Sequence, residues 1–160
     1  MKKAKKKTTV RKRKTATKAT SKAPPKKRAT LQNRLEIEFG EAMKSAKGYV
    51  QNPSRLRQLV SEAAKKAAAL PKEQFQETWS YLQAMLRLIR AYYRGDYREV
   101  SSTDLVIIIA AILYLINPMD FLPDWIPGLG LLDDAFILAL AVGRTRKSLD
   151  DFMSWEIAAS

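Results

Sequence analysis

The fold of this chain is decided by residues 105–143, which read LVIIIAAILYLINPMDFLPDWIPGLGLLDDAFILALAVG. Two strongly apolar runs lie on either side of a connector rich in Pro, Gly and Asp. No Lys or Arg occurs between Arg98 and Arg144, although the whole chain carries 29 of them. The same interval holds six carboxylates, at Glu99, Asp104, Asp120, Asp124, Asp133 and Asp134. This pattern predicts a helical hairpin with an acidic tip.

The first apolar run, residues 105–116, is apolar on every side of a helix, so it must be buried either in protein or in lipid. Ser101 or Ser102 can cap its start, and Asn117 followed by Pro118 ends it. Twelve residues span about 18 Å, which is short of the roughly 30 Å of a bilayer core. The run is therefore not a conventional transmembrane span, and burial in lipid or in protein stays open.

The second apolar run, residues 131–142, predicts another helix. We expect it to end at Gly143, with the basic residues that follow favourably placed at its C-terminal end. Residues 148–160 then predict one short amphipathic turn or helix.

Three segments upstream of the hairpin, at residues 31–50, 53–70 and 71–94, carry apolar residues at helical spacing. These positions are Leu31, Leu35, Phe39, Ala42, Ala46 and Tyr49 in the first, Leu56, Val60, Ala63, Ala67 and Leu70 in the second, and Phe75, Trp79, Leu82, Leu86, Ile89 and Tyr93 in the third. Asn52 followed by Pro53 forms an N-cap and first-turn pair. Because no alternating strand pattern appears, we predict an all-α fold, a small helical bundle around the apolar hairpin.

The third segment also carries a basic strip, formed by Arg87, Arg90, Arg94 and Arg98 at steps of three and four. Such a strip marks either a binding surface or an ordinary solvated helix face. The solvated face is the favoured interpretation from the sequence.

The first 30 residues hold eleven Lys, three Arg and no acidic residue, whereas residues 31–160 carry 15 basic and 16 acidic residues. Such a segment cannot bury enough apolar surface to offset the entropy of ordering, so we predict a disordered tail. Its charge favours contact with polyanions, either nucleic-acid phosphates or anionic lipid headgroups, over a purely solubilising role. The expected polyanion-binding residues are Lys2, Lys3, Lys5, Lys6, Lys7, Arg11, Lys12, Arg13 and Lys14.

The chain has no Cys and no His. Thiol nucleophiles, Ser-His-Asp catalysis and zinc sites with Cys or His ligands are therefore excluded. The N-terminus lacks the short apolar run of a secretory signal, so we expect a bacterial cytoplasmic protein or one on the cytoplasmic face of the inner membrane.

The connector resembles the signature of the YkvA-like family, a bacterial domain of unknown function. The signature positions are Pro118, Asp120, Pro123, Asp124, Pro127, Gly130, Asp133 and Asp134, and this chain fits all of them. The resemblance covers about residues 80–156, including AYYRGDYR at residues 91–98. It implies no reaction, cofactor or partner, although family members are described as membrane-associated.

Four acids at the connector, Asp120, Asp124, Asp133 and Asp134, could supply oxygen ligands for Ca²⁺ or Mg²⁺. Alternatively they cap short helices and accept N–H groups in a Pro-rich turn, which we favour because the spacing is not that of a known calcium loop. No nucleophile, phosphate cradle or oxyanion hole accompanies them.

We therefore predict a non-catalytic, membrane-associated helical protein whose tail contacts anionic surfaces, with no cofactor and no small-molecule substrate. A nucleoid-associated protein with a histone-like tail is one alternative, and a divalent-cation-binding module at the connector is another. The predicted organisation is a tail at 1–30, amphipathic helices at 31–78 and a YkvA-like domain at 79–156 with the hairpin at 102–147.

Overall fold

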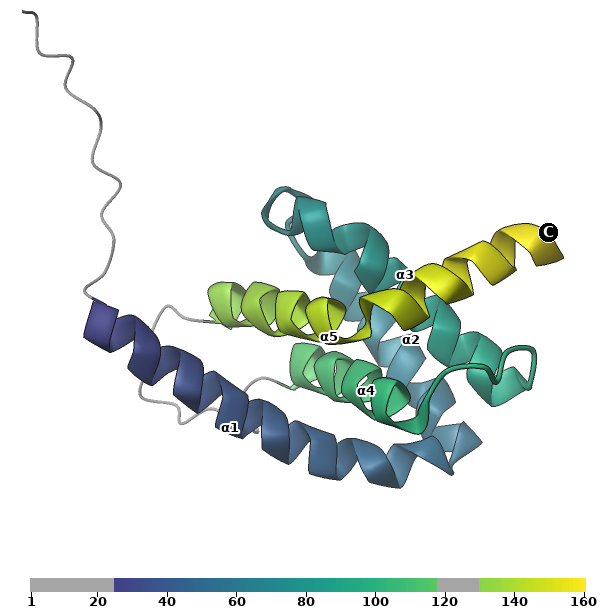
Figure 1. The fold of residues 1–160 in the computed structure, drawn as a ribbon, viewed down its shortest axis with the longest axis horizontal. Coiled ribbons are helices and arrows are strands. Elements are labelled where there is room, and N and C mark those ends of the chain that lie inside the picture. The colour runs from purple at the N-terminus through teal and green to yellow at the C-terminus, as the bar shows by residue number, and fades with distance from the viewer. Residues whose placement is uncertain (1–24, 118–129) are drawn as a thin grey trace, which may run out of the picture.

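The computed structural model describes residues 25–117 and 130–160, apart from the side chains of residues 25–32, 74 and 131–134. These residues form five α-helices and one short 3₁₀ helix (Figure 1). The elements are α1 (Pro25–Val50), α2 (Pro53–Ala69), η1 (Lys72–Phe75), α3 (Gln76–Arg94), α4 (Ser102–Ile116) and α5 (Gly130–Ala159). No strand occurs in the described part of the chain, and the all-α prediction is confirmed.

The starts of two helices follow the capping expected from the sequence. The side chain of Asn52 accepts the backbone N–H of Arg55 at 3.1 Å, and Pro53 begins α2. Ser101 is the cap of α4, because its Oγ accepts the backbone N–H of Asp104 at 3.0 Å. Each cap satisfies a donor that the first helical turn leaves without an intrahelical partner.

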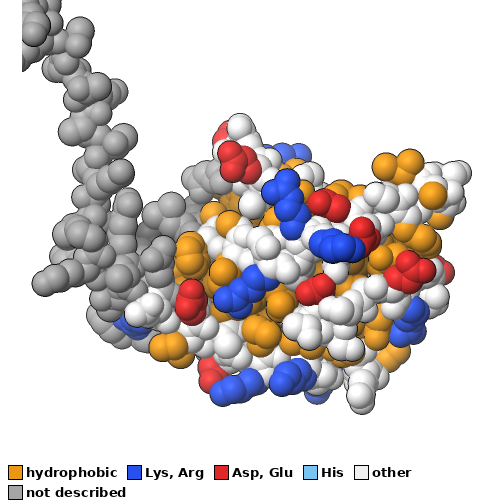
Figure 2. Space-filling model, in the orientation of Figure 1, with side chains coloured by type: hydrophobic (Ala, Val, Ile, Leu, Met, Phe, Trp, Pro, Cys, Tyr) orange, Lys and Arg blue, Asp and Glu red, His pale blue; other side chains and the backbone are white. Residues whose placement is uncertain are grey.

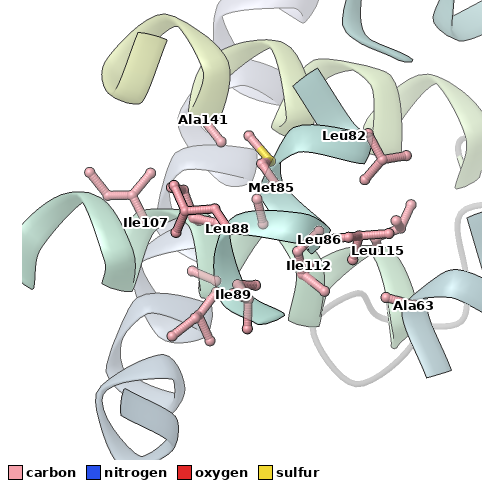
Figure 3. Close-up of a cluster of buried hydrophobic side chains, with 14 of the residues drawn as sticks. Ala63, Leu82, Met85, Leu86, Leu88, Ile89, Ile107, Ile112, Leu115 and Ala141 are labelled. Carbon is pink, nitrogen blue, oxygen red and sulfur yellow. The ribbon is translucent and has the colours of Figure 1, made fainter. Parts of the chain in front are cut away.

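Helix α4 is the centre of the bundle. Its buried residues are Leu105, Val106, Ile107, Ile108, Ile109, Ala110, Ala111, Ile112, Tyr114 and Leu115. Side chains of α2, α3, α4 and α5 meet in one close-packed cluster (Figure 3). Helix α1 lies along α4 and adds Leu35, Phe39, Ala42 and Ala46 to the same core. The first apolar run is thus buried in protein, by the amphipathic helices that precede it.

Residues from both of the predicted helical parts belong to this single core. The boundary placed between residues 78 and 79 falls inside α3. Ser148 of α5 also donates a hydrogen bond to Asp104 Oδ2 of α4 at 2.5 Å, which ties the second half of α5 to the start of α4.

The fifth helix does not end at Gly143, as the sequence led us to expect, but continues to Ala159. Within the described residues the only glycine with positive φ is Gly95, so Gly143 keeps helical geometry. Beyond it the helix is supported by ion pairs one turn apart, Lys147 to Asp151 at 2.7 Å and Arg146 to Asp150 at 3.9 Å. The predicted short C-terminal helix is therefore the second half of α5.

The second half of α5 also has an apolar face of its own. Leu149 and Phe152 are buried, and Met153 and Trp155 are partly buried against the core. Thr145 Oγ1 donates to the carbonyl oxygen of Ala141 at 2.8 Å, a bond that often bends a helix. In Figure 1 the two halves of α5 run in different directions.

Helix α1 begins at Pro25, six residues inside the segment that we expected to be disordered. The prediction was therefore wrong for residues 25–30. A proline suits the start of a helix, because its fixed φ is helical and the N–H it lacks has no intrahelical partner there. The rest of the predicted tail, residues 1–24, lies outside the described residues.

Candidate functional site

The sequence-predicted site residues fall largely outside the described part of the chain. This holds for the nine tail residues between Lys2 and Lys14 and for the signature residues Pro118, Asp120, Pro123, Asp124 and Pro127. Gly130 begins α5, and the backbones of Asp133 and Asp134 lie near the start of that helix. In residues 25–117 and 130–160 no group of three or more His, Cys, Asp or Glu side chains could hold a metal ion. The cation site at the connector stays a prediction.

The basic strip of α3, in contrast, is fully described. Its four arginines are all exposed. Three of them, Arg87, Arg90 and Arg94, line an open hollow of about 240 Å³ between α3 and the C-terminal half of α5. Arg98 does not line this hollow, and its guanidinium lies over the ring of Tyr92 at 4.3 Å.

We call this space the arginine hollow. It is lined by Arg87, Arg90, Ala91, Arg94, Asp96, Phe152, Trp155 and Glu156. The three arginines come from one face of α3, and the last three residues come from one face of α5, where they are spaced three and four apart. The hollow therefore combines cations, carboxylates and an apolar floor.

The end of α3 places Asp96 at the hollow. Gly95 has a φ of 87°, the left-handed conformation that ends many helices, and its N–H donates to the carbonyl oxygen of Tyr92 at 3.1 Å. The N–H of Asp96 then donates to the carbonyl oxygen of Ala91 at 2.9 Å. These two bonds close the end of the helix, and Asp96 lines the same hollow as Arg90 and Arg94.

An aromatic cluster holds α5 against this turn. Tyr97 is only 4% exposed, and its ring centroid lies 5.2 Å from that of Phe152 and 5.1 Å from that of Trp155. Burial raises the pKa of the Tyr97 hydroxyl above its ordinary value, with further contributions from the carboxylates of Glu99 and Asp151. The floor of the hollow is therefore fixed by packing.

The charges of the hollow differ in whether they are paired. Arg87 Nε donates to Glu156 Oε1 at 2.8 Å and joins α3 to α5. Within the described residues, the guanidinium groups of Arg90 and Arg94 and the carboxylate of Asp96 make no ion pair, hydrogen bond or ring contact. Two cations and one anion are thus available to a ligand.

A second hollow, of about 210 Å³, lies at the C-terminal end of α4. Its charged groups are already engaged, because Arg55 lies over the ring of Tyr49 at 5.5 Å and Glu62 accepts a hydrogen bond from Gln58 at 2.8 Å. The arginine hollow is therefore the stronger candidate for a binding site.

Sequence reasoning found the arginines but missed Asp96 and Glu156 as their neighbours. Arg87 and Glu156 are 69 residues apart, and helical spacing within one segment says nothing about such a pair. The sequence signal that could have found them is aromatic, since Tyr97, Phe152 and Trp155 flank these charged residues on both segments.

Comparison with known proteins places the chain among its relatives. Residues 104–140 match the family described as protein of unknown function (DUF1232). The chain is 32% identical over 95 residues to "Uncharacterized membrane protein YkvA" of Bacillus subtilis (strain 168), a match that covers 59% of this chain and 90% of the relative. The chain belongs to the YkvA-like family. No solved structure matches it.

The YkvA-like match includes the buried helix α4 and the first third of α5, which are the two arms of the hairpin. Across residues 25–117 and 130–160, each helix is either too short or too polar to cross a membrane.

Proposed function

We propose that this YkvA-like protein is a non-catalytic, peripheral protein of anionic membrane surfaces, and that the arginine hollow faces the membrane. The observation that carries the proposal is that Arg90 and Arg94 are exposed, make no ion pair with any described residue, and line the hollow together with the C-terminal end of α5. The relative from B. subtilis is named a membrane protein, which supports a membrane role.

The C-terminal end of α5 has the composition of a membrane-interface contact. Ile157 is 79% exposed, and Trp155 is half-buried with an edge at the hollow. In Figure 1 this end of α5 projects from the bundle, and Figure 2 shows hydrophobic side chains on the projection. A Trp beside arginines suits the boundary between headgroups and acyl chains, where apolar and charged partners lie a few ångströms apart.

The remaining surface offers less to an anionic bilayer. On the face drawn in Figure 2, Lys and Arg side chains are interspersed with Asp and Glu. Several cations elsewhere are already in ion pairs, including Lys44 with Glu41 at 2.6 Å and Lys147 with Asp151 at 2.7 Å. Membrane attraction would therefore come from the arginine hollow and from the basic residues 1–24.

Co-sedimentation with vesicles tests the proposal. The full chain should sediment with vesicles containing phosphatidylglycerol and not with pure phosphatidylcholine vesicles, and binding should fall between about 50 mM and about 500 mM salt. The double variant Arg90→Gln/Arg94→Gln should bind more weakly by about fivefold per arginine, since a basic residue near an anionic surface contributes about 1 kcal/mol.

Lys65→Gln/Arg144→Gln is the matched control. Both residues are exposed and lie outside the arginine hollow, and the variant loses the same two charges. If the control weakens binding as much as the hollow variant, net charge alone drives association and the hollow has no special role. Deletion of residues 1–24 measures the tail's share in the same assay.

Absence of binding to phosphatidylglycerol vesicles at low salt would overturn the proposal. Titration of duplex DNA under the same conditions tests the main alternative function, binding to nucleic acid. Tighter binding to DNA, falling steeply with salt, would favour a nucleoid-associated protein.

A further inference from the structure

The free charges of the arginine hollow are of both signs. A site that attracted only phosphate would gain from the absence of Asp96, because its carboxylate repels a second anion. Glu156, the other acid of the lining, is engaged by Arg87 at 2.8 Å but keeps one oxygen open. The lining therefore fits a ligand that carries a negative and a positive group a short distance apart.

The negative group of such a ligand has a defined place. Arg90 and Arg94 are four residues apart on α3, so their side chains emerge one above the other, with Cβ atoms about 5–6 Å apart. Both side chains line the hollow, and the guanidinium groups of two such neighbours can converge on one phosphate, each through parallel N–H donors.

The positive group is expected to be a primary ammonium. An ammonium has three N–H donors, and the carboxylates of Asp96 and Glu156 are acceptors for them. A quaternary ammonium would instead need several aromatic faces. The hollow offers chiefly Trp155, whose ring is stacked on Phe152 with centroids 5.8 Å apart.

We propose that the arginine hollow binds a phosphoethanolamine group, with its phosphate on Arg90 and Arg94 and its ammonium on Asp96 and Glu156. The volume of about 240 Å³ is below that of pockets for drug-sized ligands, which suits a small headgroup. The inference rests on the proposed function in taking a membrane lipid as the source, although the free headgroup has the same chemistry.

Soluble headgroups test the site without a membrane. Glycerophosphoethanolamine, glycerophosphocholine and glycerol 3-phosphate are titrated into the full chain, and binding is followed by the amide and indole NMR signals. We expect glycerophosphoethanolamine to bind about tenfold more tightly than glycerophosphocholine, because only the former has ammonium N–H donors. The signals that shift should include those of Arg90, Arg94 and Trp155.

Two variants separate the two halves of the ligand. Asp96→Asn should lower the ratio of the two affinities, because only Glu156 is left to accept from the ammonium, while glycerol 3-phosphate binds as well as before or better. Arg90→Gln/Arg94→Gln should weaken all three ligands by about tenfold or more. Lys65→Gln/Arg144→Gln should behave as the wild type, and circular dichroism checks that each variant keeps its helices.

Equal affinities for the ethanolamine and choline compounds would overturn the inference, as would an unchanged ratio in Asp96→Asn or shifts confined to another surface. Vesicles separate this failure from failure of the proposed function. Binding to phosphatidylglycerol vesicles with no gain on adding phosphatidylethanolamine, and no soluble binding, would remove the headgroup site and keep the membrane role. Tight binding of the soluble compound without sedimentation on any vesicle would keep the site, assign it a free ligand and remove the membrane role.

Discussion

The side chain of Tyr97 lies at the junction where the segment after α3 packs against α5. It is 4% exposed, and it contacts both Phe152 and Trp155 through its ring. Burial, together with the carboxylates of Glu99 and Asp151, raises the pKa of its hydroxyl above the ordinary value of 10.0. The folded protein thus holds this proton more tightly than the unfolded chain does.

The stability of the protein should consequently fall at alkaline pH. A group whose pKa is raised on folding contributes stability that is complete below its unfolded-state pKa and is lost as the pH rises through the folded-state pKa. We expect the free energy of unfolding to decline as the pH rises above about 10, and to decline less in Tyr97→Phe. Urea unfolding at several pH values measures this, with Tyr49→Phe as a control for loss of a tyrosine hydroxyl elsewhere.

Lys147 contributes in the same direction, because the carboxylate of Asp151 raises the pKa of its ammonium. The comparison of Tyr97→Phe with the wild type removes this common contribution. An identical pH dependence in the two proteins would show that the Tyr97 hydroxyl is not desolvated as the structure has it.

At the scale of residues, the sequence predicted which charged side chains share one helix face, but not which residues of other segments lie near them. The helical spacing of Arg87, Arg90 and Arg94 was enough to place them on one strip. The pairing of Arg87 with Glu156 depends on how α5 crosses α3, which no local pattern encodes. Gly95 is a local signal for a left-handed helix end, but it does not show that Asp96 lines the same hollow as the arginines.

Helix α5 is the element for which the sequence prediction went furthest wrong. A glycine followed by basic residues is typical of a helix end, and Gly143 followed by Arg144 fits that pattern. The apolar face that continues through Leu149 and Phe152 outweighs it, because those side chains are buried against the core. Tertiary packing here overrides a local stop signal.

Substitution of two glycines by alanine tests the course of α5. Gly143 is exposed within a helix and has no neighbouring atom within 4 Å of an added Cβ, so Gly143→Ala should stabilise the protein by about 0.5–1 kcal/mol. Gly95→Ala should destabilise it by about 1–2 kcal/mol, because its φ of 87° is strained for alanine. Thermal or urea unfolding measures both, and destabilisation by Gly143→Ala would mean that the helix ends there.

Helix α4 was predicted with its type and its limits nearly as observed, because an all-apolar run between Ser101 and Asn117 leaves few choices. Its surroundings were not predictable from the run itself, since lipid and protein interiors favour the same residues. The apolar stripes of the three upstream helices were the sequence feature that favoured burial of α4 in protein.

Ile108→Ala distinguishes the two surroundings by experiment. Ile108 is fully buried in α4, so its truncation should cost about 2–5 kcal/mol in the free energy of unfolding in aqueous buffer. Ile37→Ala, at a side chain that is 66% exposed on α1, should change it by less than about 0.5 kcal/mol. A small effect of Ile108→Ala would place α4 outside the core in solution.

The described residues form one core, and α1 is part of it. Phe39 is 1% exposed, although it lies outside the region that matches the family and outside the region that resembled it from the sequence. Only the amphipathic pattern of residues 31–50 predicted that this helix would pack, and its partner could not be read from that pattern.

A single core predicts a single unfolding transition. Urea curves followed by far-UV circular dichroism and by tryptophan fluorescence should coincide, and Phe39→Ala should shift both by the same amount, corresponding to a loss of about 3–5 kcal/mol. Separate transitions would show that α1 unfolds independently of α3 and α5, which carry Trp79 and Trp155.

The length of α5 gives the molecule two distant ends with different chemistry. Its 30 residues measure about 45 Å along the helix. The end of α4 and the start of α5, between which the family signature runs, lie together at one side of Figure 1, and the C-terminal end of α5 lies at the other. If the arginine hollow rests on a bilayer, the end of α4 and the start of α5 are held away from the lipid. A membrane at the C-terminal end of α5 would then leave the opposite end of the α4–α5 pair exposed to the aqueous phase.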